Sequence, residues 1–162
     1  MADAITDIIT PIRLDYTITA GKAQKRFLRG LEKGRILAQR CPRCTKVYIP
    51  PRGSCPTCGV PTEEEVEVSD TGTLTTFCVV DLPFYGQAVD IPYVCASVLL
   101  DGADLPFFHL IQGVDVAEVR MGMRVQAVWE DADKRRPSFT SIKCFKPVDE
   151  PDADYDTYKD HI

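Results

Sequence analysis

The stretch Cys41-Pro42-Arg43-Cys44, followed after a ten-residue spacer by Cys55-Pro56-Thr57-Cys58-Gly59, decides how the first part of this 162-residue chain folds. Each Cys-x-x-Cys pair suits a tight turn whose backbone amides point at the thiolates. Two such pairs so close together are best explained by one shared metal ion. Four thiolates make the closed tetrahedral set of a structural zinc site, with no position left for water or substrate. The sequence therefore predicts zinc bound by Cys41, Cys44, Cys55 and Cys58.

Disulfide bonds, a redox-active motif and an iron site are the alternatives to structural zinc. Disulfide bonding is disfavoured because seven cysteines is an odd number and nothing in the chain resembles a signal peptide. A redox-active Cys-x-x-Cys motif would not need a second copy. Iron stays open as the alternative metal, since a rubredoxin-like site uses the same Cys-Pro-x-Cys-Gly turn. With either metal the site holds structure and performs no chemistry.

Charge divides the chain into two unlike parts. Residues 1–60 contain 11 Lys and Arg against 4 Asp and Glu, a balance of +7, whereas residues 61–162 contain 8 against 20, a balance of −12. Only the first part would attract an anionic ligand strongly, although a solvated basic helix explains the same charges. No apolar run is long enough to span a membrane. Together with the unpaired cysteines, this favours the cytoplasm.

The residues before the first cysteine pair predict an extended arm and one helix. Residues 1–16 show no period and are expected to be extended. Residues 17–34 are expected to be helical, with Thr17 or Thr19 as the N-cap and with Phe27 and Leu31 on one apolar stripe. Three glycines weaken this helix, so we expect it to lean on a surface of its own domain or of a partner.

Beyond an acidic joint at residues 63–65, the pattern becomes that of a β domain. Strands are predicted at residues 73–80, 93–100, 106–111, 123–129 and 138–145, with a short helix or turn at 114–119. Such an order favours a five-stranded Greek-key barrel of the OB type, with a β-sandwich as the alternative.

Three further cysteines, one histidine and the acidic tail carry weaker expectations. Cys78, Cys95 and Cys144 are expected to be reduced, half-buried core residues, and His109 to be packed in a strand. The tail is expected to be disordered, unless its two tyrosines anchor it to a partner. The predicted fold is thus mainly β, and it has four parts. These are an N-terminal arm and helix (1–36), a rubredoxin-like zinc ribbon (37–62), an OB-type barrel (63–147) and an acidic tail (148–162).

The complete order of motifs resembles one family. The matching elements are residues 27–35, 39–44, 50–52, 55–59, 72–74, 91–93 and 121–125. They resemble the zinc-ribbon/OB-fold proteins, long catalogued as a domain of unknown function, that accompany thiolase-like enzymes. The resemblance covers roughly residues 20–147 and keeps the order of the family's motifs.

The resemblance implies a non-catalytic small subunit of an acyl-CoA enzyme complex. Members of the family form tight complexes with thiolases, thiolase-fold aldolases, hydroxymethylglutaryl-CoA synthases or acetyltransferases. Some are fused to acyl-CoA hydratase subunits. A chain of this length suits the branch of benzoylsuccinyl-CoA thiolase or that of the steroid side-chain aldolases. The expected assembly is a heterotetramer with two copies of each chain and with acyl-CoA at or near their interface.

The residues themselves agree with such a role. The chain offers no Ser-His-Asp set, no cysteine with a neighbouring base and no phosphate-binding glycine loop, so no catalytic residue is expected in it. The residues expected to contact the partner are Phe27, Leu31, Phe84 and Tyr85. The residues expected to contact CoA are Lys22, Lys25, Arg26, Arg29, Arg43 and Arg52. The alternative function is single-stranded nucleic-acid binding, which the acidic barrel disfavours; neither nucleic acid nor a membrane is an expected partner.

Overall fold

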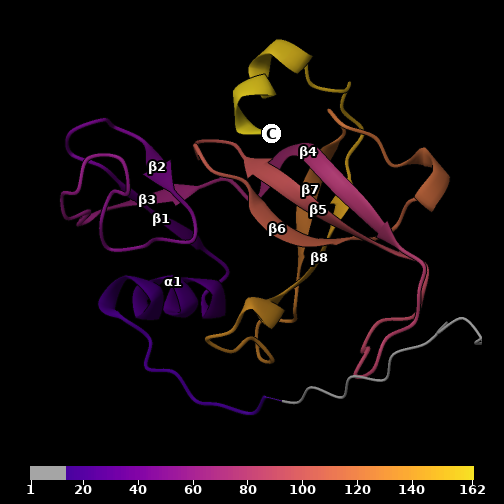
Figure 1. Cartoon of the computed structure of the whole chain (residues 1–162), viewed down its shortest axis with the longest axis horizontal. Helices are drawn as coiled ribbons and strands as arrows, with labels where there is room; N and C mark the ends of the chain where they lie inside the picture. The colour runs from indigo at the N-terminus through magenta and orange to yellow at the C-terminus, as the bar shows by residue number, and fades with distance from the viewer. Residues whose placement is uncertain (1–13) are drawn as a thin grey trace, which may run out of the picture.

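The computed structural model describes residues 14–162, so most of the predicted N-terminal arm lies outside the described residues. Figure 1 shows a small sheet that lies over one helix, with a larger barrel beside them. The fold is mainly β, as predicted. Within the described range, no helix has both the length and the apolar character needed to cross a membrane.

The helix α1 spans Lys22–Glu32 and is shorter than the predicted helix at 17–34. Its N-cap is Gly21, which supplies no side-chain hydrogen bond. The predicted caps Thr17 and Thr19 are therefore wrong, and residues 14–20 have no regular structure. The helix ends just before Gly34, whose φ of 72° is a conformation that favours glycine.

The small sheet has three antiparallel strands in the order β2-β1-β3, namely β1 (Ile36–Arg40), β2 (Val47–Tyr48) and β3 (Glu64–Val68). β3 differs from the prediction, which placed its residues in a joint and at the start of the barrel. It pairs with β1 along its whole length, from Ile36↔Val68 to Arg40↔Glu64. These residues therefore complete the sheet of the metal-binding ribbon.

Ion pairs accompany the strand that forms at the predicted acidic joint. The carboxylate of Glu67 accepts from the Arg35 guanidinium at 2.6 Å, which raises the pKa of Arg35. Glu64 pairs with Arg40 at 3.3 Å, and Glu65 with Arg26 of α1 at 3.0 Å. Part of the sequence's charge asymmetry is thus neutralised within the chain, although each pair is exposed and contributes little stability.

The barrel is closed, with the strand order β4-β5-β6-β8-β7 and β7 paired back to β4. Its only parallel contact among the described strands joins β6 to β8. The short helix η1 (Val116–Glu118) lies between β6 and β7, where a helical link was predicted. The strands are β4 (Thr71–Val80), β5 (Tyr93–Leu100), β6 (Phe107–Ile111), β7 (Arg124–Trp129) and β8 (Ile142–Pro147). This is the predicted OB topology.

One continuous core joins the helix, the ribbon and the barrel. Phe27 and Leu31 of α1 are fully buried in the same cluster as Ile36 of the ribbon and the inward side chains of the barrel. The ring of Phe27 lies 6.3 Å from that of Phe107 in β6 and 5.5 Å from that of Phe139 in η2 (Phe139–Ser141). The apolar stripe of the helix therefore packs on its own chain.

The acidic tail is folded against the barrel, which corrects the prediction of disorder. It forms two short helical turns, η3 (Tyr155–Thr157) and η4 (Lys159–His161), between which Tyr158 is buried. The carboxylate of Asp152 accepts two hydrogen bonds from Arg120, at 2.6 and 2.9 Å, and the carboxylate of Glu150 accepts one from Arg124 at 2.9 Å.

The remaining cysteines and His109 follow the prediction in part. Cys144 is buried and Cys95 half-buried, but Cys78 is exposed because its side chain lies on the outer face of β4. His109 is packed as expected, between the rings of Phe107 and Phe145. Burial lowers the pKa of His109.

Candidate metal centre

The two cysteine turns repeat the same backbone geometry. In the first, the N–H of Thr45 donates to the carbonyl of Cys41 at 3.0 Å, and in the second the N–H of Gly59 donates to that of Cys55 at 2.9 Å. Thr45 and Gly59 occupy equivalent positions and both have positive φ, 62° and 67°. The turns differ at this position. Thr45 in the first turn has a side chain, which makes a positive φ unfavourable, whereas Gly59 in the second turn adopts it without strain.

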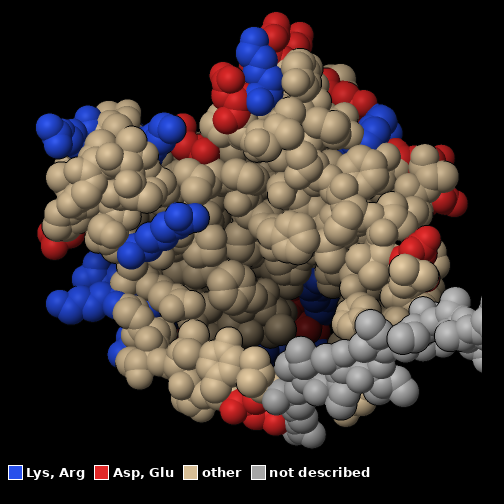
Figure 2. Space-filling view, in the orientation of Figure 1, with Lys and Arg blue, Asp and Glu red and all other residues tan. Residues whose placement is uncertain are grey.

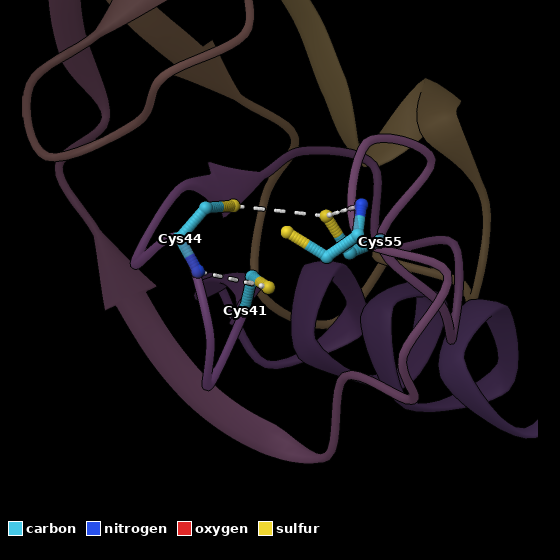
Figure 3. Close-up of side chains that lie close together, drawn as sticks. Cys41, Cys44 and Cys55 are labelled. Carbon is cyan, nitrogen blue, oxygen red and sulfur yellow. Dashed lines mark hydrogen bonds between the residues drawn. The ribbon is translucent and has the colours of Figure 1, made fainter.

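Backbone amides point at the sulfurs, as the spacing predicted. The N–H groups of Arg43 and Cys44 both donate to the Sγ of Cys41 at 3.4 Å, and the N–H of Cys58 donates to the Sγ of Cys55 at 3.3 Å. Figure 3 shows the side chains of Cys44 and Cys55 directed at each other, with 3.7 Å between their sulfurs. Such N–H···S contacts stabilise thiolates rather than thiols.

The four sulfurs form one cluster that suits a single metal ion. The Sγ atoms of Cys41, Cys44, Cys55 and Cys58 all lie within 4.8 Å of one another, and no other such group occurs in residues 14–162. Burial and the neighbouring thiols raise the pKa of Cys58 to about 12. Four sulfurs packed this closely cannot all ionise unless a cation compensates their charge, so the donor set fits a bound metal.

Tyr48 in β2 is a functional residue that the sequence prediction missed. Its hydroxyl lies 3.1 Å from the Sγ of Cys55, and its side chain is buried. Burial alone would raise the pKa of the Cys55 thiol, but the hydrogen bonds from Tyr48 and from the N–H of Cys58 lower it to about 6. The same contact raises the pKa of Tyr48 to about 12. Tyr48 lies in β2, whose pairing with β1 helps to place its hydroxyl at the metal site.

Two polar side chains hold the loops around the metal centre. The Oε1 of buried Gln39 accepts from the N–H of Gly53 and from the hydroxyl of Thr62, both at 3.1 Å, which fixes the segment carrying the second turn. The carboxylate of Asp104, in the loop between β5 and β6, accepts from the N–H of Val47 at 2.7 Å. The metal-binding ribbon is therefore fastened to the barrel by backbone as well as by apolar contacts.

The four residues predicted to contact a partner differ in exposure. Phe27 and Leu31 cannot contact a partner in this fold, because both side chains are 0% exposed and fill the shared core. Phe84 and Tyr85, in the loop between β4 and β5, are 54% and 88% exposed. The exposed aromatic loop therefore remains available for contacts, and the helix stripe does not.

The basic residues predicted to contact CoA do not gather in one place. Lys22 and Arg52 line one groove of about 650 Å³ between the start of α1 and the segment Pro50–Gly53, with Phe139 on its wall. Arg26 lines a neighbouring groove and is paired with Glu65. The other three lie apart from these grooves, Arg43 in the first cysteine turn and Lys25 and Arg29 along the helix.

Two family models match the chain. One, described as the rubredoxin-like zinc ribbon domain of ChsH2, matches residues 29–64, and the other, described as the C-terminal OB-fold domain of ChsH2, matches residues 65–130. The first match and the clustered sulfurs confirm the predicted zinc site.

Curated proteins resemble the chain, among them two that are at least 32% identical to it. A "DUF35 domain-containing scaffold protein" of Methanocaldococcus jannaschii is 34% identical over 120 residues, which cover 70% of this chain and 82% of that protein. A "probable enoyl-CoA hydratase alpha subunit" of Thermomonospora curvata is 32% identical over 122 residues, which cover 75% of this chain. The matched region is 36% of that hydratase subunit, so the chain spans about a third of its length.

The fold recurs in solved structures, among them two with TM-scores of 0.60 or more. One is named "Ltp2-ChsH2(DUF35) aldolase"; its matching chain has a TM-score of 0.61 and 24% identity, over 81% of this chain and 98% of that one. The other is a DUF35-family protein of unknown function from Sulfolobus solfataricus, with a TM-score of 0.60 and 18% identity, over 79% of this chain and 87% of that one. At these identities the likeness concerns the arrangement of the ribbon and the barrel.

Proposed function

This chain belongs to the DUF35 family, in which a ChsH2-type zinc ribbon precedes an OB-fold domain, and we propose that it is a non-catalytic small subunit of a thiolase-type acyl-CoA enzyme complex. The partner would be a thiolase, such as benzoylsuccinyl-CoA thiolase, or a thiolase-fold aldolase. The chain would support assembly and help to shape the acyl-CoA site in the cytoplasm, with two copies of each subunit in the complex. The names of the scaffold, aldolase and hydratase relatives support a role beside an enzyme, and the thiolase type of that enzyme comes from the resemblance of the sequence motifs.

The observation that carries the proposal is the closed character of the metal site. All four positions of a tetrahedral ion would be taken by cysteine sulfurs, so zinc there would supply folding stability and no Lewis-acid chemistry. The one described histidine inside the barrel, His109, is packed between aromatic rings rather than placed beside a nucleophile. Catalytic residues are therefore expected in the partner.

The groove lined by Lys22 and Arg52 is the proposed contact for the phosphates of CoA. No acidic residue lies in the first turn of α1, so the positive end of the helix dipole adds to these two cations. The exposed loop with Phe84 and Tyr85 is proposed to contact the partner near the acyl end. Lys22 also lines the neighbouring groove with Arg26, but Arg26 is paired with Glu65, so Lys22 and Arg52 are the proposed pair.

Single-stranded nucleic-acid binding remains the alternative, because OB barrels commonly bind single strands. Such binding needs cations along the barrel together with exposed aromatic rings. Phe108 of β6 offers a ring, but residues 61–162 carry a balance of −12. Phosphate contacts dominate nucleic-acid affinity, so the charge favours a protein partner.

The test is purification of the tagged chain from the cells that make it, under native conditions. The proposal expects a stoichiometric thiolase-fold subunit, identified by mass spectrometry, whose CoA-dependent activity falls when the two subunits are separated and returns when they are mixed. Recovery of the chain alone, or with nucleic acid, would contradict it.

The CoA contact has its own test on the assembled complex. The double variant Lys22→Ala/Arg52→Ala should raise the KM for the CoA substrate several-fold with kcat and assembly unchanged. Lys33→Ala, just beyond the other end of α1, is the matched control and should leave the KM unchanged. Equal KM values for all three proteins would remove the groove from the proposal.

A further inference from the structure

The outer face of the sheet formed by β4, β5 and β6 carries no charged side chain over three successive rows. β5 alternates strictly, so that Val94, Ala96 and Val98 are buried in the barrel and the residues between them are half-exposed on its outside. The strand register aligns these outer residues with their neighbours in β4 and β6. The outer patch consists of Thr76, Ser97 and Phe108 in one row, Cys78, Cys95 and Leu110 in the next, and Val80 and Tyr93 in the third.

The outer patch is open and apolar. Phe108 is 64% exposed and Cys78 is also exposed. In Figure 2 the region over β5 and β6 shows uncharged surface, and the charged side chains lie mostly around the edge of that face. An uncharged centre inside a charged rim is the usual anatomy of a protein–protein interface.

The loop at residues 81–92 extends this surface. It leaves β4 after Val80 and returns to β5 at Tyr93, the two residues of the third row. Its exposed apolar side chains are those of Leu82, Phe84 and Tyr85, at 75%, 54% and 88% exposure. The outer patch therefore leads into a loop with three exposed apolar side chains, in which the charged residues are Asp81 and Asp90.

Charge decides which occupant suits this surface. The outer patch has no Lys or Arg, so it attracts neither nucleic acid nor an anionic membrane. In a symmetric self-contact a second copy would bring Asp81 and Asp90 of both loops toward each other, and the repulsion between these carboxylates opposes self-association. A different protein with an apolar centre and a basic rim satisfies both the patch and its surroundings.

We propose that the outer patch and the loop at 81–92 dock the partner enzyme subunit, through an apolar face of that subunit bordered by Lys and Arg. This rests on the proposed function, which supplies the partner. It places the contact on the barrel and leaves the metal turns and the groove of α1 outside it. Phe108 is the anchoring side chain, since it is the well-exposed aromatic ring of the outer patch and aromatic side chains often carry much of the binding energy of an interface.

The first experiment uses Cys78 as a natural probe on the purified complex. Iodoacetamide should alkylate Cys78 readily in the free chain and at least about tenfold more slowly in the complex, as followed by peptide mass spectrometry. Asp133→Cys, in the exposed turn after β7, provides a control thiol away from the patch, and its rate should be equal in both states. An unchanged rate at Cys78 in the complex would overturn the proposed surface.

The second experiment compares Phe108→Glu with Met121→Glu. Both replace an exposed apolar side chain by a carboxylate, but Met121 lies in the turn before β7 and outside the patch. Phe108→Glu should raise the Kd for the isolated partner subunit about 30-fold or more, and Met121→Glu should not. Unchanged zinc content and circular dichroism verify that both variants are folded.

The outcomes separate this inference from the proposed function. If the complex forms, but Phe108→Glu leaves the Kd unchanged and Cys78 is alkylated at the same rate in both states, the proposed function stands and the surface is wrong. If sedimentation shows that the free chain dimerises and that Phe108→Glu makes it monomeric, the patch is a self-contact and the inference is overturned. Failure to recover any thiolase-fold partner rejects the proposed function first.

Discussion

The ribbon and the barrel achieve stability by different means. The ribbon has strands of two to five residues, and the core around its metal site consists of Cys41, Tyr48 and Cys55 with a few half-buried neighbours. The barrel closes on itself with strands of up to ten residues, and its inward side chains dominate the large cluster. The cysteine turns bury little apolar surface of their own and depend on their ligand, whereas the barrel, whose core also takes in Ile36 and Val68 of the small sheet, does not. The comparison teaches that removing the metal and removing core volume should damage different parts of one molecule.

The largest effect should follow the loss of one metal ligand. Cys55→Ser should abolish stoichiometric zinc and unfold the two cysteine turns with β2, because structural zinc contributes on the order of 10–16 kcal/mol of apparent binding free energy in small peptides. Elemental analysis measures the metal, and hydrogen exchange locates the loss of structure. Cys78→Ser is the control and should retain zinc. Loss of hydrogen-exchange protection throughout the barrel as well would show that the barrel also depends on the metal.

The next effect should appear where the two parts join. Phe27→Ala empties a fully buried site between the ribbon, β6 and η2, and should lower the free energy of unfolding by about 3–5 kcal/mol. Urea denaturation followed by circular dichroism measures it. Phe84→Ala removes an exposed ring of the same size and should change stability by about 0.5 kcal/mol or less. Equal effects of the two substitutions would contradict the position of Phe27 in the shared core.

A smaller effect, confined to the metal site, should come from Tyr48→Phe. The substitution keeps the buried ring and removes the hydroxyl that lies 3.1 Å from the Cys55 sulfur. Partners of metal ligands typically contribute 10–100-fold to metal affinity, so zinc binding should weaken by at least about tenfold. Competition with a chromophoric chelator gives the affinity, and Tyr85→Phe serves as an exposed control. An affinity equal to that of the unmodified protein would mean that the hydroxyl does not act on the metal site.

The smallest effect should distinguish the two cysteine turns from each other. Thr45 has a φ of 62° where the second turn has Gly59, so Thr45→Gly should relieve strain and stabilise the folded protein by up to about 1 kcal/mol. Gly59→Thr should destabilise it by at least as much. Thermal unfolding of the zinc-bound proteins compares them. A destabilised Thr45→Gly variant would show that the hydrogen bond from its hydroxyl to the carbonyl of Cys44 outweighs the strain.

The metal centre could be predicted from sequence because its ligands are set by local spacing. Two residues between cysteines fix a turn, and two turns fix a four-thiolate set, whatever the rest of the chain does. The OB topology was predictable because alternating strands and glycine turns recur in a known order. These features depend on neighbours within a few residues of each other.

The partner surface and the tail could not be predicted in this way. An apolar stripe on a helix indicates that Phe27 is buried, but not against which chain. Arg120 and Asp152 are 32 residues apart, and Phe27 packs near Phe107, 80 residues further along the chain. Contacts between segments distant in sequence decide these points, and a single sequence does not record them.

Asp104 has a consequence for the order in which the protein is made. It contacts Val47, 57 residues before it, through its N–H and its carboxylate, and His161, 57 residues after it, through its carbonyl. Because synthesis proceeds from the N-terminus, the contact with Val47 becomes available before β6, β7 and β8 have been translated. The contact with His161 must wait for all three. A nascent chain can thus fasten its ribbon to an unfinished barrel, and the tail joins that same point only after the last barrel strand exists.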